Sequence, residues 1–229
     1  MIEPVRDLTA VREATDRLLH AASGMDNAAV AEPSRLPGWS RGHVLAHVAR
    51  NADALVNVLQ GRPMYVTGEA RDADIERDAP RPLSVQLDDV RESAGRFQAA
   101  GAGDADWSRT VELRNGVKDA AARIPFRRLV EVELHHVDLG VGYELEDLPA
   151  DFVEREIDFL TERYTGHKDV PATTVVADDG RAWTTGGGAD GGPVTVKGPA
   201  PDLLGWLAGR RDGSVLEVSD GPLPVLPPL

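Results

Sequence analysis

Apolar residues recur at helical spacing in four segments of the first 140 residues, and Gly- and Pro-rich connections separate these segments. Apolar positions that return every three to four residues are typical of amphipathic helices. The spacing predicts helices over residues 5–22, 40–59, 83–100 and 125–140. Ser40 is the expected N-cap of the second helix, and Pro125 suits the first turn of the fourth. We therefore expect a four-helix bundle with long connections.

Two of these connections carry weaker patterns. Residues 61–82 are expected to form a loop, because they contain several Gly, Pro and acidic residues. Residues 107–117 are ambiguous, with a possible extended piece over residues 110–113.

The pattern changes after residue 140, where a further helix is followed by segments rich in β-branched residues. We expect a helix over 151–164, strands over 173–177, 181–185 and 194–197, a helix over 200–208 and a strand over 214–218. The run from Gly186 to Gly192 is expected to be a hairpin loop, since it lacks the Lys-Ser/Thr pair and the strand–loop–helix context of a phosphate-binding motif. The change predicts two domains, an α-helical one over residues 1–145 and a small α+β one over residues 146–229.

Composition and charge argue against some classes of binding partner and some cellular locations. The formal net charge of −13 argues against nucleic acid or an anionic membrane as a partner, because both favour clustered Lys and Arg. The chain contains no cysteine, so it has no disulfide, no thiolate metal ligand and no cysteine nucleophile of its own. The first residues lack a signal-peptide pattern, and no apolar run reaches the length of a membrane span. We expect a soluble, cytoplasmic protein.

The chemistry is expected on the fourth helix. Its helical spacing places Glu131, His135 and Asp138 on one face, at intervals of four and three residues. A carboxylate and an imidazole one turn apart can bind a single divalent ion, but a third ligand must come from elsewhere. His47 on the second helix is the candidate, and a histidine hydrogen-bonded at the edge of the core is the alternative interpretation. His43, one turn earlier, could also reach such a site but is expected to be solvated.

Three stretches of the sequence resemble one known family. LPGWSRGHVLAHVARNADAL over residues 36–55, IPFRRLVEVELHHVDL over 124–139 and VKGPAPDLLGWLAGR over 196–210 are similar to the mycothiol-dependent maleylpyruvate isomerases. The stretches lie in the same order and leave mainly loop-rich sequence between them. The resemblance implies an N-terminal DinB-like four-helix bundle that binds a divalent metal, followed by a small sterol-carrier-like α/β domain.

The resemblance also implies roles for individual residues. The metal ligands would be His47, Glu131 and His135. The family's essential arginine falls on Arg210, with Arg211 left open as its neighbour.

The resemblance favours this ligand pair over a second pair on the same helix. Glu133 and His136 lie on a rotated face, and His136 would then contact a loop or the neighbouring domain. Asp138 is expected to orient a metal ligand, and the alternative is a helix-end carboxylate paired with an arginine.

A zinc ion, or another divalent metal, held by two imidazoles and one carboxylate has an open fourth position, as in catalytic sites. The resemblance implies that the sulfur of mycothiol binds there as a thiolate and adds to the cis double bond of maleylpyruvate. Rotation and expulsion of the thiolate then give fumarylpyruvate, a step in the degradation of aromatic compounds. The partners would be this substrate and a low-molecular-weight thiol, with the enzyme a monomer. A mycothiol S-transferase and a non-enzymatic zinc-binding regulatory module are the alternatives.

Overall fold

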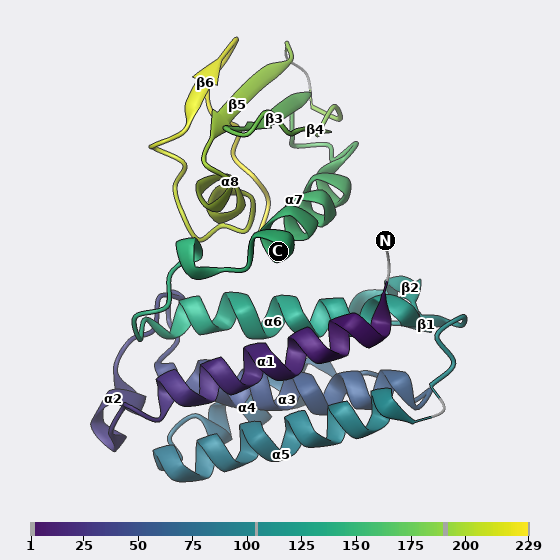
Figure 1. Cartoon of the computed structure of the whole chain (residues 1–229), viewed down its shortest axis with the longest axis vertical. Coiled ribbons are helices and arrows are strands. Elements are labelled where there is room, and N and C mark those ends of the chain that lie inside the picture. The colour runs from purple at the N-terminus through teal and green to yellow at the C-terminus, as the bar shows by residue number, and fades with distance from the viewer. Residues whose placement is uncertain (1–2, 104, 190–191, 229) are drawn as a thin grey trace. The chain divides into compact units, whose positions relative to one another are not determined.

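A computed structural model describes residues 3–103, 105–189 and 192–228 of the chain. The chain forms two compact units, Met1–Tyr143 and Glu144–Leu229, and each is described by itself. The first unit is helical and the second contains a sheet (Figure 1). The predicted order, an α-helical part followed by an α+β part, is confirmed.

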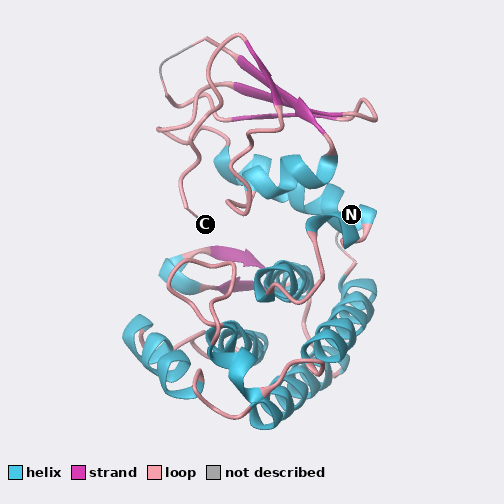
Figure 2. Cartoon of the chain, turned by 90° about the vertical axis from the view of Figure 1, so that its left-hand side faces the viewer, coloured by secondary structure: helices cyan, strands magenta, loops and turns pink. Residues whose placement is uncertain are grey.

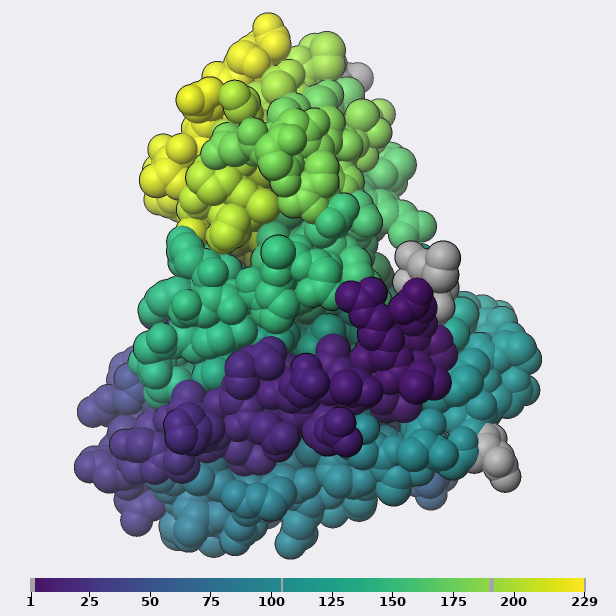
Figure 3. Space-filling view, viewed as in Figure 1, coloured from purple at the N-terminus to yellow at the C-terminus, as the bar shows by residue number. Residues whose placement is uncertain are grey.

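The N-terminal unit is built on four long helices. In the described residues these are α1 Pro4–Ala22, α3 Arg41–Leu59, α5 Leu83–Ala102 and α6 Ile124–Leu139. Both α1 and α3 pack against α5 and α6, so the four helices enclose a common core (Figure 2). The core consists of the apolar stripes that the spacing predicts, and the outer face of α1 runs across the surface of the unit (Figure 3). Ser40 caps α3 as expected, within a capping box completed by His43.

The expectation of a loop over residues 61–82 is wrong in part, because the segment contains helix α4, Gly68–Asp78. Thr67 caps this helix by accepting a hydrogen bond from the Ala70 backbone N–H. Ile75 is the one apolar residue that α4 buries, so no apolar stripe marks the helix in the sequence.

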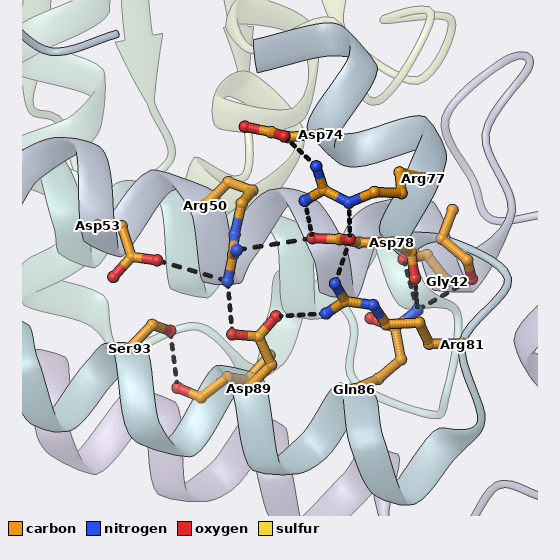
Figure 4. A network of polar contacts seen from close by, with 12 residues as sticks. Gly42, Arg50, Asp53, Asp74, Arg77, Asp78, Arg81, Gln86, Asp89 and Ser93 are labelled. Atoms are coloured by element: carbon orange, nitrogen blue, oxygen red, sulfur yellow. Dashed lines mark hydrogen bonds and ion pairs between the residues drawn. The ribbon is translucent and has the colours of Figure 1, made fainter. Parts of the chain in front are cut away.

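A network of charges holds α4 against the bundle (Figure 4). The fully buried carboxylate of Asp78 contacts the guanidinium groups of Arg50, Arg77 and Arg81. The Gln86 amide, from α5, donates hydrogen bonds to the carbonyls of Asp78, Ala79 and Gly42. The network therefore ties α4 to α3 and α5 through polar contacts in place of an apolar face.

Several short elements complete this unit. Strand β1, Thr110–Glu112, confirms the possible extended piece over residues 110–113, and it pairs antiparallel with β2, Lys118–Ala120. The short elements are α2 Asn27–Ala31, β1 Thr110–Glu112, η1 Arg114–Gly116, β2 Lys118–Ala120 and η2 Ala121–Arg123.

The C-terminal unit packs two helices against a four-stranded sheet. Its elements are η3 Leu145–Asp147, α7 Ala150–Tyr164, β3 Thr173–Ala177, β4 Ala182–Thr185, β5 Val194–Gly198, α8 Ala200–Leu207 and β6 Glu217–Ser219. The strand order is β4-β3-β5-β6, and β3 and β5 are parallel while the other neighbours are antiparallel. Helices α7 and α8 contact each other and lie on one face of the sheet (Figure 2).

The hairpin predicted for the run from Gly186 to Gly192 is wrong. The run joins β4 to β5, which are not neighbours, and the hairpin is instead formed by β3 and β4. Residues 190 and 191 of the run lie outside the described residues. Gly186 is required for packing, because it has a φ of 68° and an added Cβ would lie 1.9 Å from the carbonyl oxygen of Pro171.

No helix in the described part of the chain is both long enough and apolar enough to cross a membrane.

Candidate metal site

Helices α3 and α6 pack together and bring His47 to Glu131 and His135. The Oε2 atom of Glu131 lies 2.9 Å from His47 Nε2 and 3.3 Å from His135 Nε2. One possible ligand atom from each of the three residues lies within 4.8 Å of the other two. We call these three residues the triad. The donor atoms converge on one point, so the triad could hold a metal ion.

The triad is closed on its histidine side and open on its carboxylate side. His47 and His135 are buried, whereas 32% of the Glu131 side chain is exposed. The ring of Trp39 lies 5.4 Å from that of His47, and the two histidine rings meet edge-on at 4.6 Å. Among the three residues, Glu131 is therefore the one most accessible to a ligand.

Burial gives the triad a defined protonation state. Burial lowers the pKa of His47 to about 4, although Glu131 opposes the shift, so the ring is neutral at neutral pH. Burial would raise the pKa of Glu131, but its hydrogen bonds with His135 and His47 outweigh burial and hold that pKa well below its ordinary value. The site therefore offers a neutral imidazole and an ionised carboxylate.

Asp138 supports the second histidine of the triad. Its Oδ2 lies 2.8 Å from Nδ1 of His135, and its side chain is fully buried. Burial lowers the pKa of His135, but the hydrogen bonds to Asp138 and Glu131 outweigh it and the pKa is raised. A carboxylate on the second ring nitrogen fixes the ring orientation and leaves Nε2 free to bind a metal. The contact expected between Asp138 and a ligand residue is present.

Two residues beside the triad were not predicted from the sequence. Arg71 on α4 donates a hydrogen bond from Nη2 to Nδ1 of His47, at 3.1 Å. Tyr65 has a raised pKa, first because of burial and then because of the charge of Glu131, while Arg71 opposes the rise. Tyr65 also lines a cavity of about 760 Å³, together with Arg62 and Arg114. Both residues lie in the segment expected to be a loop, where no apolar periodicity indicates their position.

The remaining histidine candidate of α3 lies outside the triad. His43 Nδ1 accepts a hydrogen bond from the Ser40 backbone N–H, and its Nε2 lies 3.4 Å from Glu76. Only 20% of its side chain is exposed, because Trp39 stacks on the ring. The expectation of a solvated ring is therefore only partly met.

The alternative pair on α6 faces a different set of residues. Glu133 accepts hydrogen bonds from Arg17 of α1 and from the Tyr143 hydroxyl. His136 stacks on the Tyr143 ring, with centroids 4.0 Å apart. These contacts place Glu133 and His136 on a face rotated from the triad, as the helical spacing predicts.

The two candidate arginines belong to the C-terminal unit. Arg211 forms salt bridges with Asp202 of α8 and Glu146 of η3, so it connects these two elements. Arg210 donates a hydrogen bond to the Ala208 carbonyl and lines a cavity of about 590 Å³. The salt bridges give Arg211 a structural role in this unit.

Comparisons with known proteins identify the family. Residues 11–140 match the family model of the mycothiol maleylpyruvate isomerase N-terminal domain, and residues 147–228 match that of the MDMPI C-terminal domain. A crystal structure of a mycothiol-dependent maleylpyruvate isomerase is similar with a TM-score of 0.89 and 28% identity, over 99% of this chain and 97% of that one. A histidine-to-alanine mutant of such an isomerase has a TM-score of 0.88 and 27% identity, over the same shares of the two chains. No curated protein shows significant similarity. The chain belongs to the family of mycothiol-dependent maleylpyruvate isomerases.

Proposed function

We propose that the protein catalyses the mycothiol-dependent isomerisation of maleylpyruvate to fumarylpyruvate, with a metal held by His47, Glu131 and His135. The observation that carries this proposal is the convergence of two imidazoles and one carboxylate at one point, in a chain of this family. The proposal assigns residues 1–145 to the metal-binding domain and residues 146–229 to the second domain of a cytoplasmic monomer.

The donor set fits a catalytic zinc ion. Two imidazoles and one carboxylate are typical of catalytic sites that keep a fourth position open, and imidazole ligands favour zinc over harder cations. When bound, the ion would supply a Lewis-acidic position at which a thiol loses its proton near neutral pH. Imidazole binds a metal in its neutral form, and burial keeps His47 in that form at neutral pH. Asp138 holds the ring of His135 in place.

The thiol must come from a small molecule, because the chain has no cysteine. In the proposed reaction the thiolate sulfur forms a bond to one alkene carbon, and the π electrons move into the adjacent ketone as an enolate. The former double bond then rotates. Return of the electrons expels the thiolate and leaves the trans alkene, so no oxidant or further reactant is consumed.

Cationic side chains are proposed to receive the two carboxylates of the substrate. Arg71 lies against the triad, and Arg62 and Arg114 line the cavity that Tyr65 borders. Arg210 of the C-terminal unit is proposed as the essential arginine. A bidentate guanidinium–carboxylate contact is strong and directional, which suits the orientation of a dianion in an acidic protein.

The test is a product assay with the zinc-loaded protein, maleylpyruvate and mycothiol. We expect fumarylpyruvate to form only when the thiol and the metal are both present. Steady formation without a thiol would contradict the thiolate mechanism. A stable thioether between mycothiol and a supplied electrophile, with no fumarylpyruvate formed, would instead identify a mycothiol S-transferase.

The role of Arg210 is tested by comparison with its neighbour. Arg210→Ala should lower kcat/KM by about two orders of magnitude or more and leave zinc content unchanged, because a charge-assisted contact to the substrate is lost. Arg211→Ala is the matched control, since it removes an adjacent arginine that is paired with Asp202 and Glu146. A larger loss of kcat/KM in the Arg211 variant, with its fold retained, would transfer the role to Arg211.

A further inference from the structure

Arg128 on α6 is a fully buried arginine without a hydrogen-bonded carboxylate. Its side chain is 0% exposed, and its Nη1 donates hydrogen bonds to the Val48 carbonyl and to Oδ1 of Asn51, each at 2.8 Å. Its Nε and Nη2 have no hydrogen-bond partner among the described residues. A buried guanidinium is unfavourable unless a nearby negative charge balances it.

The charge that balances Arg128 belongs to the triad. Burial lowers the pKa of Arg128 to about 10, and the charge of Glu131 opposes this shift ahead of Asp53 and Tyr65. The Asp53 carboxylate is already paired with Arg96. The raised pKa of Tyr65 keeps its hydroxyl neutral at neutral pH. Glu131 is therefore the main counter-charge of a cation that stays protonated.

Arg128 lies about one helical turn from Glu131 along α6, and its hydrogen-bond partner Asn51 lies about one turn from His47 along α3. Arg128 precedes Glu131 by three residues on α6, and its partner Asn51 follows His47 by four residues on α3. Residues three and four apart on a helix are neighbours on one face. The guanidinium thus lies along the α3–α6 contact, where its hydrogen-bond partners Val48 and Asn51 follow His47 by one and four residues.

We propose that Arg128 is a positioning residue that acts through its charge, by weakening the binding of the divalent ion and strengthening the binding of an anionic ligand such as a thiolate. This inference rests on the proposed function. The physical reason is that one buried positive charge repels a second cation and attracts an anion at the same place, and little water screens either interaction. The residue need not touch metal, thiol or substrate to have this effect.

The proposal predicts opposite effects of the Arg128 charge on zinc binding and on thiolate binding, and this difference is what the experiment tests. Arg128→Met removes the charge and keeps much of the length, whereas Arg128→Lys keeps the charge. Arg127→Met is the matched control, because Arg127 is the adjacent arginine of α6 and is ion-paired with Asp119. Zinc affinity is measured by competition with a chromophoric chelator. Thiolate binding is measured on the cobalt-substituted protein with 2-mercaptoethanol, as the pH at which the sulfur-to-cobalt charge-transfer band reaches half of its intensity.

In Arg128→Met we expect about tenfold tighter zinc binding and a rise of about one unit in the pH midpoint for the thiolate. The lysine variant and the Arg127 variant should stay within about twofold of the unaltered protein on both measures. A merely structural role would loosen the site, so it would weaken zinc and thiolate together. That result, or no change in either measure, would overturn the proposal.

A second variant covers the case in which Arg128→Met does not fold. Arg128→Gln is neutral and retains an N–H donor for the Val48 carbonyl. If neither neutral variant folds while Arg128→Lys does, the charge serves the fold and the proposal is overturned. Retained zinc and thiolate binding without isomerisation of maleylpyruvate would contradict the proposed function alone, because these measurements do not use that substrate. Failure of the unaltered protein to bind zinc would overturn both.

Discussion

The carboxylate of Asp138 is the most direct point at which to test the site. Its Oδ2 lies 2.8 Å from Nδ1 of His135, and the side chain is fully buried, so solvent cannot replace this contact. Asp138→Asn keeps the shape of the side chain and an oxygen that can accept from the ring N–H. The substitution therefore removes the charge and little else.

The expected magnitude follows from the hydrogen bond that is weakened. A hydrogen bond to a charged group contributes about 1.5–3 kcal/mol, and a neutral one about 0.5–1.5 kcal/mol. The midpoints of these ranges differ by about 1.3 kcal/mol, which is close to the 1.4 kcal/mol that changes a dissociation constant tenfold. Changes to a residue that orients a metal ligand typically weaken metal binding by about 10–100-fold. We therefore expect the zinc dissociation constant of Asp138→Asn to rise about tenfold.

The measurement should be made at a pH where His135 is neutral in both proteins. Asp138 helps to raise the pKa of His135, so the substitution also reduces competition from the proton. At lower pH this gain would offset part of the loss in zinc affinity. A competition titration with a chromophoric chelator, repeated at increasing pH until the ratio of the two zinc dissociation constants stays constant, avoids the compensation.

Asp89→Asn is the matched control for this prediction. The Asp89 carboxylate is paired with Arg50 and Arg81 in the network between α3, α4 and α5, away from the triad. Its replacement should leave the zinc dissociation constant within about twofold of the unaltered protein. Equal zinc affinity in the Asp138 variant and the unaltered protein, or equal losses in the two variants, would refute the argument.

Three further predictions follow from single residues. His47→Ala should reduce bound zinc from one ion per chain to nearly none in elemental analysis, and undiminished metal would remove His47 from the ligand set. Gly42→Ala should lower the free energy of unfolding in urea by about 2 kcal/mol, because the added Cβ would lie 2.1 Å from the Ala79 carbonyl oxygen; Gly95→Ala, with nothing within 4 Å, should not. Because the pKa of His135 is raised in the folded protein, protonation of this ring stabilises the fold fully below about pH 6.5, and this stabilisation is lost as the pH rises through the folded pKa. The lowered pKa of His47 does not change the free energy of unfolding with pH well above about 6.5, because the ring is then neutral in both states. The metal-free protein should therefore lose stability as the pH rises above about 6.5, and a His135→Gln variant that keeps the slope would contradict this.

The bundle could be predicted from the sequence because burial there follows spacing. Helix α3 buries Val44, Leu45, Val48 and Leu55, which mark one face of a helix unambiguously. Helix α4 has no such face, since its contacts with the bundle pass through Asp78 and its arginine partners. A charged residue looks the same in a sequence whether it is exposed or buried in a network. Charge networks between helices therefore leave no signal in the apolar periodicity.

The site was predictable to the extent that helix geometry determines it. The spacing of Glu131, His135 and Asp138 is sufficient to place the three side chains on one face of α6. The third residue of the triad, His47, is 84 positions from Glu131 in the chain. Helix spacing made it a candidate, and the family resemblance favoured that interpretation over a histidine at the edge of the core. Arg71 could not be found in this way, because its approach to His47 depends on how α4 packs.

The prediction of a hairpin at the glycine run failed for a different reason. The run from Gly186 to Gly192 has the composition of a tight turn, and composition describes the turn but not the strands that it connects. The pairing of β3 with β5 is parallel and joins strands that are not consecutive, so it depends on contacts outside the loop. Glycine at 186 reflects the close approach of Pro171 and not a hairpin.

The polar residues along the α3–α6 contact link stability to function in this bundle. His47, His135, Asp138 and Arg128 are all buried at or beside this contact. Each of them loses hydration on folding, and well-packed apolar residues of similar volume would avoid that loss. Packing alone therefore does not account for four such residues along one helix–helix contact. Their arrangement is accounted for if the contact holds a cation and an anionic ligand, because the bound charges then supply the partners that the protein interior lacks.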